Sequence, residues 1–181
     1  MFSYIIGVEG IEASEIFDYL YESYFVEDFI TQKTYLNSNI YINPQSDKKE
    51  DEKELAFWHL TTREIEYTKK EGNKFVKYKE RVLDLNRADR LEWVKKIIEN
   101  HSLPEIKYFY KKETKAKKPI RLYLWLHEKD FVVILQKLGA SSSFLVTSFY
   151  IDHEDKKDDY QTYYENYING LDLELAGCEW F

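Results

Sequence analysis

Four short apolar runs in the C-terminal half of the chain constrain the fold more than any other feature. Each is rich in aromatic and β-branched residues, as strands typically are, and they occupy residues 106–110, 121–127, 131–137 and 144–152. They are separated in turn by a basic hairpin loop, a tight turn and a looser turn, at residues 111–118, 128–130 and 139–143. Because short connections join antiparallel neighbours, the sequence predicts an antiparallel meander of at least four strands.

The segment just before the meander has the spacing of an amphipathic helix. Residues 86–100 (NRADRLEWVKKIIEN) place apolar side chains on one stripe, at three- and four-residue intervals from Leu91 onward. Asn86 and Asp89 are suitable N-terminal caps for this helix. Helices packed on an antiparallel sheet of four or more strands make an α+β fold, and that is the fold class we expect.

The N-terminal third has less regular patterning. Residues 11–30 have the spacing of an amphipathic helix, and residues 37–41 form a short extended segment. Residues 45–54 (QSDKKEDEKE) contain no apolar side chain, which predicts a solvated loop or linker. This run divides the chain into an acidic N-terminal helical element with its linker, residues 1–54, and a main domain, residues 55–181.

Three further segments complete the expected main domain. Residues 57–62 are either extended or the start of a helix. A turn at Gly72 and Asn73 is followed by the alternating residues 74–81, which favours a strand or hairpin. Residues 160–167 form a short, tyrosine-rich amphipathic helix at the C-terminal end.

Charge is strongly segregated along the chain, although the formal total is only −7. Residues 1–56 carry a net −8, residues 57–148 a net +8 and residues 149–181 a net −7. A basic centre can bind phosphates locally even in an acidic protein, unless the clustering is a chance property of the surface. The acidic N-terminal segment either lies against this basic centre or completes the core with its acidic face in solvent.

Several classes of protein are disfavoured. The chain has neither a GxGxxG nor a GxxxxGK[ST] motif, which argues against the common nucleotide-binding enzymes. It lacks HExxH and paired-histidine spacings, so we expect no metal and no cofactor. The single Cys178 excludes an intramolecular disulfide and a cysteine metal cluster. No signal-peptide pattern and no membrane-spanning apolar run occur, so we expect a cytoplasmic protein without a membrane partner.

The heptapeptide FWHLTTR, residues 57–63, holds the densest set of chemically useful side chains. Within it, His59 can titrate near neutral pH, and Arg63 can hold a phosphate through two parallel hydrogen bonds. With the hydroxyls of Thr61 and Thr62 these are the groups needed to move a proton beside a phosphodiester. The alternative is a buried, hydrogen-bonded structural histidine with surface hydroxyls.

Four motifs in order, FWHLTTR, RADRLEWVKKIIEN, RLYLWLHEKDFVVILQK and FLVTSFYID, resemble the phage-associated branch of the BECR superfamily. These nucleases are the relatives of barnase, EndoU, the tRNA-cleaving colicins and RelE. The resemblance covers about residues 55–155, and nothing in residues 1–50 takes part. Unlike many relatives, which are the C-terminal modules of larger phage polypeptides, this chain has its own acidic N-terminal helix.

The resemblance implies a metal-independent endoribonuclease, a toxin or phage-conflict factor. Such enzymes activate the ribose 2′-hydroxyl against its own phosphodiester and leave a 2′,3′-cyclic phosphate, so the protein supplies only a base, an acid and cations. The implied partners are RNA, either tRNA or mRNA, and an antitoxin or immunity protein. The alternative is a non-catalytic phage or mobile-element interaction protein on the same scaffold, which the acidic ends and the aromatic surplus favour.

By this resemblance His59 is the general acid or base. Arg87 and Arg90 lie three residues apart, hence on one helical face, and can clamp the phosphate that gains charge in the transition state. Alternatively, the two arginines lie on a solvated helix face and pair with Asp84 or Asp89. Thr61 and Thr62 either orient the phosphate or cap a helix that starts there, and Arg63 joins them as a substrate-binding residue.

The family pattern also points to two residues of the last strand. Thr147 would be a hydroxyl near the phosphate, and Tyr150 a stacking or acid group. Because side chains alternate along a strand, an ideal strand cannot place both in one cleft. Either a bulge intervenes or only one of the two is functional. Arg121 and Tyr123, which alternate on a neighbouring strand, are further substrate-binding candidates.

Overall fold

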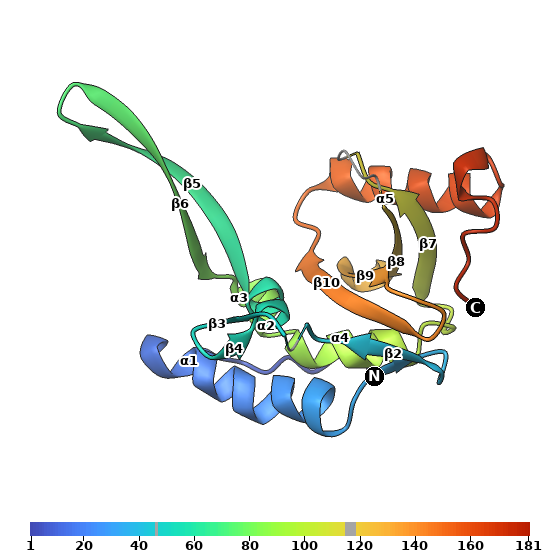
Figure 1. The fold of residues 1–181 in the computed structure, drawn as a ribbon, viewed down its shortest axis with the longest axis horizontal. Coiled ribbons are helices and arrows are strands. Elements are labelled where there is room, and N and C mark those ends of the chain that lie inside the picture. Colours follow the sequence, from blue (N-terminus) through green and yellow to red (C-terminus); the bar gives the residue numbers. More distant parts are fainter. Residues whose placement is uncertain (46, 115–118) are drawn as a thin grey trace.

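The computed structural model describes residues 1–45, 47–114 and 119–181 (Figure 1). Its centre is a curled six-stranded sheet with the strand order β1-β2-β10-β9-β8-β7, packed against helices. Two separate two-stranded ribbons, β3-β4 and β5-β6, stand outside this sheet. The α+β fold expected from the sequence is therefore confirmed. Of the predicted basic loop, residues 115–118 lie outside the described residues, as does residue 46 of the charged run.

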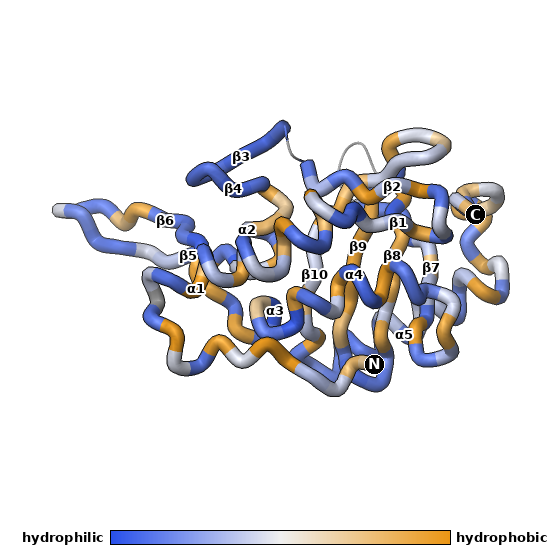
Figure 2. Tube along the Cα trace, turned by 90° about the horizontal axis from the view of Figure 1, so that it is seen from below, coloured by the Kyte–Doolittle hydropathy of each residue, from blue (hydrophilic) through white to orange (hydrophobic). Residues whose placement is uncertain are grey.

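The predicted meander is present as four antiparallel strands with the expected turns. They are β7 (Ile106–Lys112), β8 (Ile120–Leu126), β9 (Phe131–Lys137) and β10 (Ser142–Tyr150). Each pairs with the next in antiparallel register. The first five residues of β9 are all buried, because helices cover both faces of the sheet at this point. Figure 2 shows the apolar residues concentrated along β8 and β9.

The N-terminal segment extends this sheet, an arrangement that the sequence did not predict. Strand β2 (Ile40–Asn43) pairs in parallel with β10, and β1 (Tyr35–Leu36) pairs antiparallel with β2. Asn37 and Ser38 turn the chain between them with positive φ angles of 49° and 61°. The short extended segment expected at residues 37–41 is thus a turn followed by a strand.

The amphipathic helix expected over residues 11–30 is confirmed, but its winding changes along its length. An α-helix, α1 (Ala13–Leu20), continues directly into the π-helix η1 (Tyr21–Thr31). Leu20, Phe25 and Phe29 are fully buried in the same hydrophobic core as the helices and strands of the main domain. Residues 1–54 and 55–181 therefore share one core across the predicted boundary.

The single helix expected over residues 86–100 is wrong in one respect: the structure breaks it into α3 (Leu85–Ala88) and α4 (Leu91–Glu99). The break lies at Asp89, whose Oδ1 accepts a hydrogen bond from the Val8 amide at 3.1 Å and whose carbonyl accepts one from the Ile6 amide at 2.9 Å. Tertiary bonds to the N-terminal segment thus override the local helical preference. The N-cap of α3 is Asp84, not Asn86 or Asp89.

Helices cover the two faces of the meander. Helix α4 packs its apolar stripe on one face. On the opposite face lies α5 (Glu154–Ile168), which begins six residues before the predicted helix and places Tyr160 over Phe109 and Tyr123. Among the helices of residues 1–45, 47–114 and 119–181, none has the length and apolar character that a bilayer crossing requires.

The hairpin expected around Gly72 is longer than the alternation suggested. Strands β5 (Thr62–Glu71) and β6 (Lys74–Leu83) form a ribbon that projects away from the body (Figure 1). At its foot lies α2 (Leu55–Thr61), so the segment that was either extended or helical is a helix. The charged run before it, expected as a loop, contains the small hairpin of β3 (Lys49–Glu50) and β4 (Lys53–Glu54).

Candidate functional site

The foot of the β5-β6 ribbon brings several of the predicted site residues together. His59 comes from α2, Arg87 from α3 and Thr147 from β10, three elements that meet at this point (Figure 1). The Oγ1 of Thr147 donates a hydrogen bond to the His59 carbonyl at 2.9 Å. Residues far apart in the sequence are therefore held in one arrangement by short polar contacts.

A β-bulge in β10 makes this arrangement possible. Leu145 pairs with Leu135 and Thr147 with Ile134, so Val146 is the extra residue. Parallel pairing with β2 ends at Phe144, and beyond that point α2 lies along the edge of β10. This bulge precedes Thr147, and the register from Thr147 to Tyr150 is regular, so it does not bring these two side chains to one face as the first alternative required. It frees the Val146 carbonyl for a side-chain donor.

His59 supplies that donor. Its Nδ1 lies 3.1 Å from the Val146 carbonyl oxygen, and since a carbonyl can only accept, Nδ1 carries the hydrogen in the neutral ring and Nε2 carries the lone pair. Burial is the main cause that lowers the pKa of His59 below its ordinary value, against the raising effect of the bond to Val146. The positive charges of Arg81 and Arg87 lower this pKa further. The geometry favours a neutral imidazole with a basic Nε2.

Arg87 is engaged by the protein itself. Its Nη1 donates to the carbonyls of His59 and Thr62, both at 3.0 Å, and its Nε forms an ion pair with Asp84 at 3.3 Å. These carbonyls belong to the C-terminal end of α2, where helical oxygens have no partner within the helix and a cation is favoured. The contacts of Arg87 therefore hold the backbone around His59, and Asp84 is its partner as the alternative interpretation expected.

Arg90 lies in a different environment from Arg87, because the helix break separates them. Its guanidinium lies 5.3 Å from the ring centroid of Trp93 and 5.2 Å from that of Tyr150, and its Nη1 donates to the Asn86 carbonyl at 3.0 Å. Such cation–π contacts are stabilising when they are desolvated. The structure thus associates Tyr150 with Arg90, and Thr147 with Arg87.

The two threonines of the heptapeptide face inward. Thr61 Oγ1 donates to the Phe57 carbonyl at 2.9 Å, and Thr62 Oγ1 donates to the Trp58 carbonyl at 2.5 Å. Both residues are buried, and both lie where α2 ends, so the alternative that they cap a helix starting here is wrong. Arg63 is exposed on β5, close enough for its charge to lower the pKa of Arg87.

Arg121 and Tyr123 belong to the α5 side of the sheet. Tyr123 stacks on Phe109 with ring centroids 5.1 Å apart and donates its hydroxyl to Glu113 at 2.5 Å. Burial, followed by this hydrogen bond, raises the pKa of Tyr123. Arg121 donates to Gln136 at 3.3 Å. Neither contact involves the residues around His59, so the structure separates these two candidates from the rest.

A cavity of about 310 Å³ lies next to this group of residues. Its lining residues come from five elements or their connections, and they are Phe17, Glu50, Asp51, Trp58, Thr62 and Arg81. Arg81 Nη1 lies 3.4 Å from Thr62 Oγ1, and the Trp58 indole donates to the Glu50 carbonyl at 2.8 Å. Glu50 and Arg81 also affect the pKa of His59, in opposite directions.

Arg81 is the residue that sequence reasoning missed. It lies on β6 opposite Glu64 and on the same face of the ribbon as Thr62. The only signal for it in the sequence was its place at the end of the alternating run 74–81. The two carboxylates beside it, Glu50 and Asp51, come from the acidic N-terminal segment, so acidic and basic parts of the chain do meet at this cavity.

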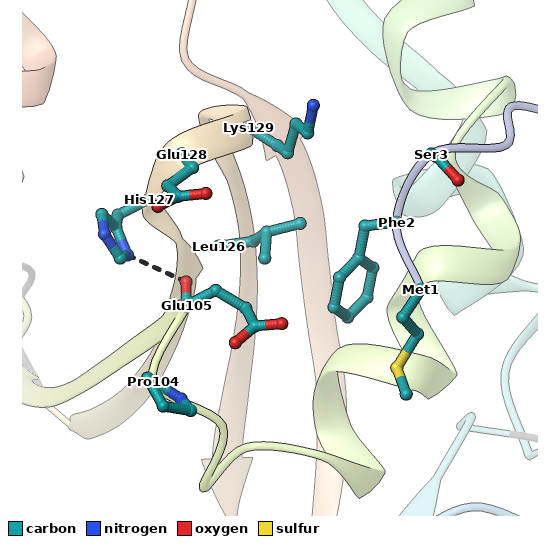
Figure 3. A pocket seen from close by; sticks show the side chains of 9 residues that line it. All are labelled: Met1, Phe2, Ser3, Pro104, Glu105, Leu126, His127, Glu128 and Lys129. Atoms are coloured by element: carbon teal, nitrogen blue, oxygen red, sulfur yellow. Dashed lines mark hydrogen bonds between the residues drawn. The ribbon is translucent and has the colours of Figure 1, made fainter.

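A second cavity, of about 500 Å³, lies at the far end of β8 (Figure 3). The side chains of Phe2 and Leu126 face one another across it, with Glu105 and Lys129 at its rim. His127 Nδ1 bonds the Glu105 carbonyl at 2.8 Å. The stretch from Leu126 to Lys129 belongs to the third motif of the sequence resemblance, but it contains no candidate site residue.

Comparison with known protein families, with characterised proteins and with solved structures gives no match. The function therefore has to be argued from the site.

The environment of His59 predicts a pH dependence of stability. The pKa values of His59 and of His101 are both lowered by burial in the folded protein. The unfolded chain then binds more protons below about pH 6.5, the ordinary histidine pKa, so the free energy of unfolding should fall as the pH drops from about 7.5 to about 5.5. Urea denaturation at several pH values measures the free energy of unfolding. Its decrease should be smaller in His59→Gln, whose amide still donates to Val146. An identical decrease in both proteins would contradict a lowered pKa of His59 in the folded state.

Proposed function

We propose that this protein is a metal-independent endoribonuclease that cleaves RNA through attack of the 2′-hydroxyl. The observation that carries the proposal is the state of His59, whose Nδ1 is bound to Val146 while no described residue hydrogen-bonds its Nε2. A neutral imidazole with a fixed tautomer and a lone pair on the second nitrogen is suited to general-base catalysis near neutral pH.

In the proposed reaction, Nε2 of His59 takes the proton of the ribose 2′-hydroxyl. The 2′-oxygen then forms a bond to the adjacent phosphorus, the bond from phosphorus to the 5′-oxygen breaks, and the 5′-oxygen takes up a proton from solvent. The products are a 2′,3′-cyclic phosphate and a free 5′-hydroxyl. Arg81, which lines the neighbouring cavity, would stabilise the negative charge that develops on the phosphate oxygens.

The surrounding residues support this chemistry through position and charge. Arg81 and Arg87 both lower the pKa of His59, and Arg63 lowers that of Arg87, so three guanidinium groups lie close together at the foot of the ribbon, beside the carboxylates of Glu50 and Asp84. Guanidinium groups placed in this way can bind a phosphate locally. In the proposal His59 and Arg81 contact the substrate, while Arg87 and Thr147 position the His59 backbone.

The biological setting remains that implied by the sequence resemblance. We propose a cytoplasmic toxin or phage-conflict nuclease acting on tRNA or mRNA and controlled by an antitoxin or immunity protein. The second candidate is a non-catalytic interaction protein, and it is favoured by the engagement of Arg87, Thr61 and Thr62 with backbone carbonyls. Expression in a host cell separates the two, because an active ribonuclease should arrest growth and a binding protein should not.

The direct test is incubation of the purified protein with RNA in excess EDTA. We expect cleavage at an unchanged rate after chelation, because the 2′-hydroxyl is the nucleophile and the base is a side chain. End-group analysis should find 2′,3′-cyclic phosphates and 5′-hydroxyls. A mock preparation from cells without the protein controls for contaminating ribonucleases. Intact RNA, or cleavage that leaves 5′-phosphates, would contradict the proposal.

A further inference from the structure

The β5-β6 ribbon is long, and most of it stands clear of the body. Ten cross-strand pairs run from Thr62 with Leu83 at the foot to Glu71 with Lys74 beside the turn. Both views show its distal part projecting beyond the helices (Figures 1 and 2). A two-stranded hairpin gains little stability by itself in water, so its length calls for an explanation outside the core of this chain.

Charge is distributed unequally along the ribbon. In the half nearer the body, Lys79 is neutralised by ion pairs with Glu64 at 2.7 Å and Glu66 at 2.9 Å. Tyr67 and Tyr78 stack across the strands at the same level, with ring centroids 5.7 Å apart. In this half, residues 62–66 and 79–83, three basic side chains are balanced by three acidic ones.

The distal end, residues 69–77, is different. It contains four lysines against the single carboxylate of Glu71, a net charge of +3 in a chain whose total is −7. All four lysines are exposed, and none has a carboxylate of a described residue within 4.0 Å; they are Lys69, Lys70, Lys74 and Lys77. Glu71 itself accepts a hydrogen bond from the Tyr78 hydroxyl. The end of the ribbon thus presents unneutralised positive charge.

An aromatic ring shares one face of the ribbon with Lys70 and Lys77, while Lys69 and Lys74 lie on the other face. Phe75 is 75% exposed and sits directly across the strands from Lys70. A ring this exposed contributes little to packing within the ribbon. Cations that follow a phosphate backbone, combined with an aromatic ring on which a base can stack, are the elements of single-stranded nucleic-acid binding.

We infer that the distal end of the ribbon, residues 69–77, binds single-stranded RNA, with Phe75 stacking on a base and the four lysines contacting phosphates. This inference rests on the proposed function and deepens it, because the distal end would hold the strand that is cleaved near His59. Double-stranded RNA fits less well, since its deep, narrow major groove does not admit such a ribbon. Charge complementarity supports a polyanion, and the acidic body would direct it to this end.

The test measures binding of the full chain to a single-stranded 2′-O-methyl RNA of about 20 nucleotides. This RNA has no 2′-hydroxyl, so binding is measured independently of cleavage. The ribbon variant replaces Lys69, Lys70, Lys74 and Lys77 with glutamine, and fluorescence anisotropy should give a Kd at least about tenfold higher. Its log Kd should also depend less steeply on log salt, by roughly 0.7 for each phosphate that the variant no longer neutralises. Phe75→Ser should weaken binding by about tenfold.

The matched control carries the same change of charge on other exposed lysines, Lys33, Lys48, Lys129 and Lys137. Its Kd should stay within about twofold of the original, since nonspecific electrostatics change little with distant charges at physiological salt. All substituted side chains are exposed, so thermal unfolding should be unchanged in both variants.

The outcomes separate this inference from the proposed function. In the first outcome, the original protein binds RNA without cleaving ordinary RNA, and the ribbon variant no longer binds; this supports the ribbon as the RNA contact and contradicts the nuclease. In the second outcome, the original protein cleaves RNA and the ribbon variant binds it as tightly as the original; this overturns the inference and leaves the proposed function intact. Equal affinity for duplex RNA, or no RNA binding at all, would also overturn it, and the latter would point to an acidic protein as the partner.

Discussion

Replacing His59 with glutamine should lower the rate of RNA cleavage by about 10²-fold or more, the usual contribution of a general acid–base group. Glutamine keeps a donor for the Val146 carbonyl, so the fold around α2 should survive while the basic nitrogen is lost. Single-turnover cleavage assays measure the change, and circular dichroism checks the fold. His59→Ala should lose at least as much rate, with an added cost in stability from the unsatisfied carbonyl.

His153→Gln is the matched control, because this histidine is exposed at the start of α5 and its ring nitrogen lies 3.6 Å from the Asp152 carboxylate. Its cleavage rate should be unchanged. A folded His59→Gln protein with the original rate would remove His59 from the chemistry and leave it a purely structural contact to Val146.

Arg87→Ala should lower the free energy of unfolding by about 3 kcal/mol, the usual cost of removing one partner from a largely buried ion pair. The change leaves the Asp84 carboxylate without its cation, and it removes the Arg87 donor from the carbonyls of Thr62 and His59, of which the latter keeps its bond from Thr147. Urea denaturation measures the difference from the midpoint and slope of the transition. The exposed Arg63→Ala serves as the control and should change the unfolding free energy by no more than about 0.5 kcal/mol.

The Arg87→Ala variant also distinguishes two roles for this arginine, positioning of His59 and direct binding of the phosphate. If Arg87 positions His59, its removal should reduce stability and the cleavage rate together while leaving RNA affinity nearly unchanged. A stable Arg87→Ala protein with greatly weakened RNA binding would mean that the guanidinium contacts phosphate directly, as the sequence first suggested.

The local parts of the fold could be predicted from the sequence, and the tertiary ones could not. The strands of the meander follow from alternation and turn residues, which act over a few neighbours. The break at Asp89 depends on hydrogen bonds from Ile6 and Val8, more than 80 residues away in the chain. The parallel pairing of β2 with β10 has the same character, because a four-residue strand carries no information about a distant partner.

The candidate site also has parts that the sequence could predict and parts that it could not. The heptapeptide singled out His59, which the structure places at a junction of three elements. Alternation along the last strand left two alternatives, a bulge that brings Thr147 and Tyr150 together or a function for only one of them. The bulge in the structure precedes Thr147 instead, so the two side chains stay on opposite faces, beside different arginines. Arg81 escaped notice because its neighbours become visible only when the register of the β5-β6 ribbon is known.

The parallel strand β2 has a consequence for how the protein is made. Tyr41 and Ser142 are partners in the sheet, and a ribosome adding about 5–20 residues per second needs roughly 5–20 s to synthesise the chain between them. Throughout that interval β2 lacks the strand with which it pairs in parallel. The net charge of −8 on residues 1–56 then serves the nascent chain, because like-charged segments repel one another and resist association while they wait for β10.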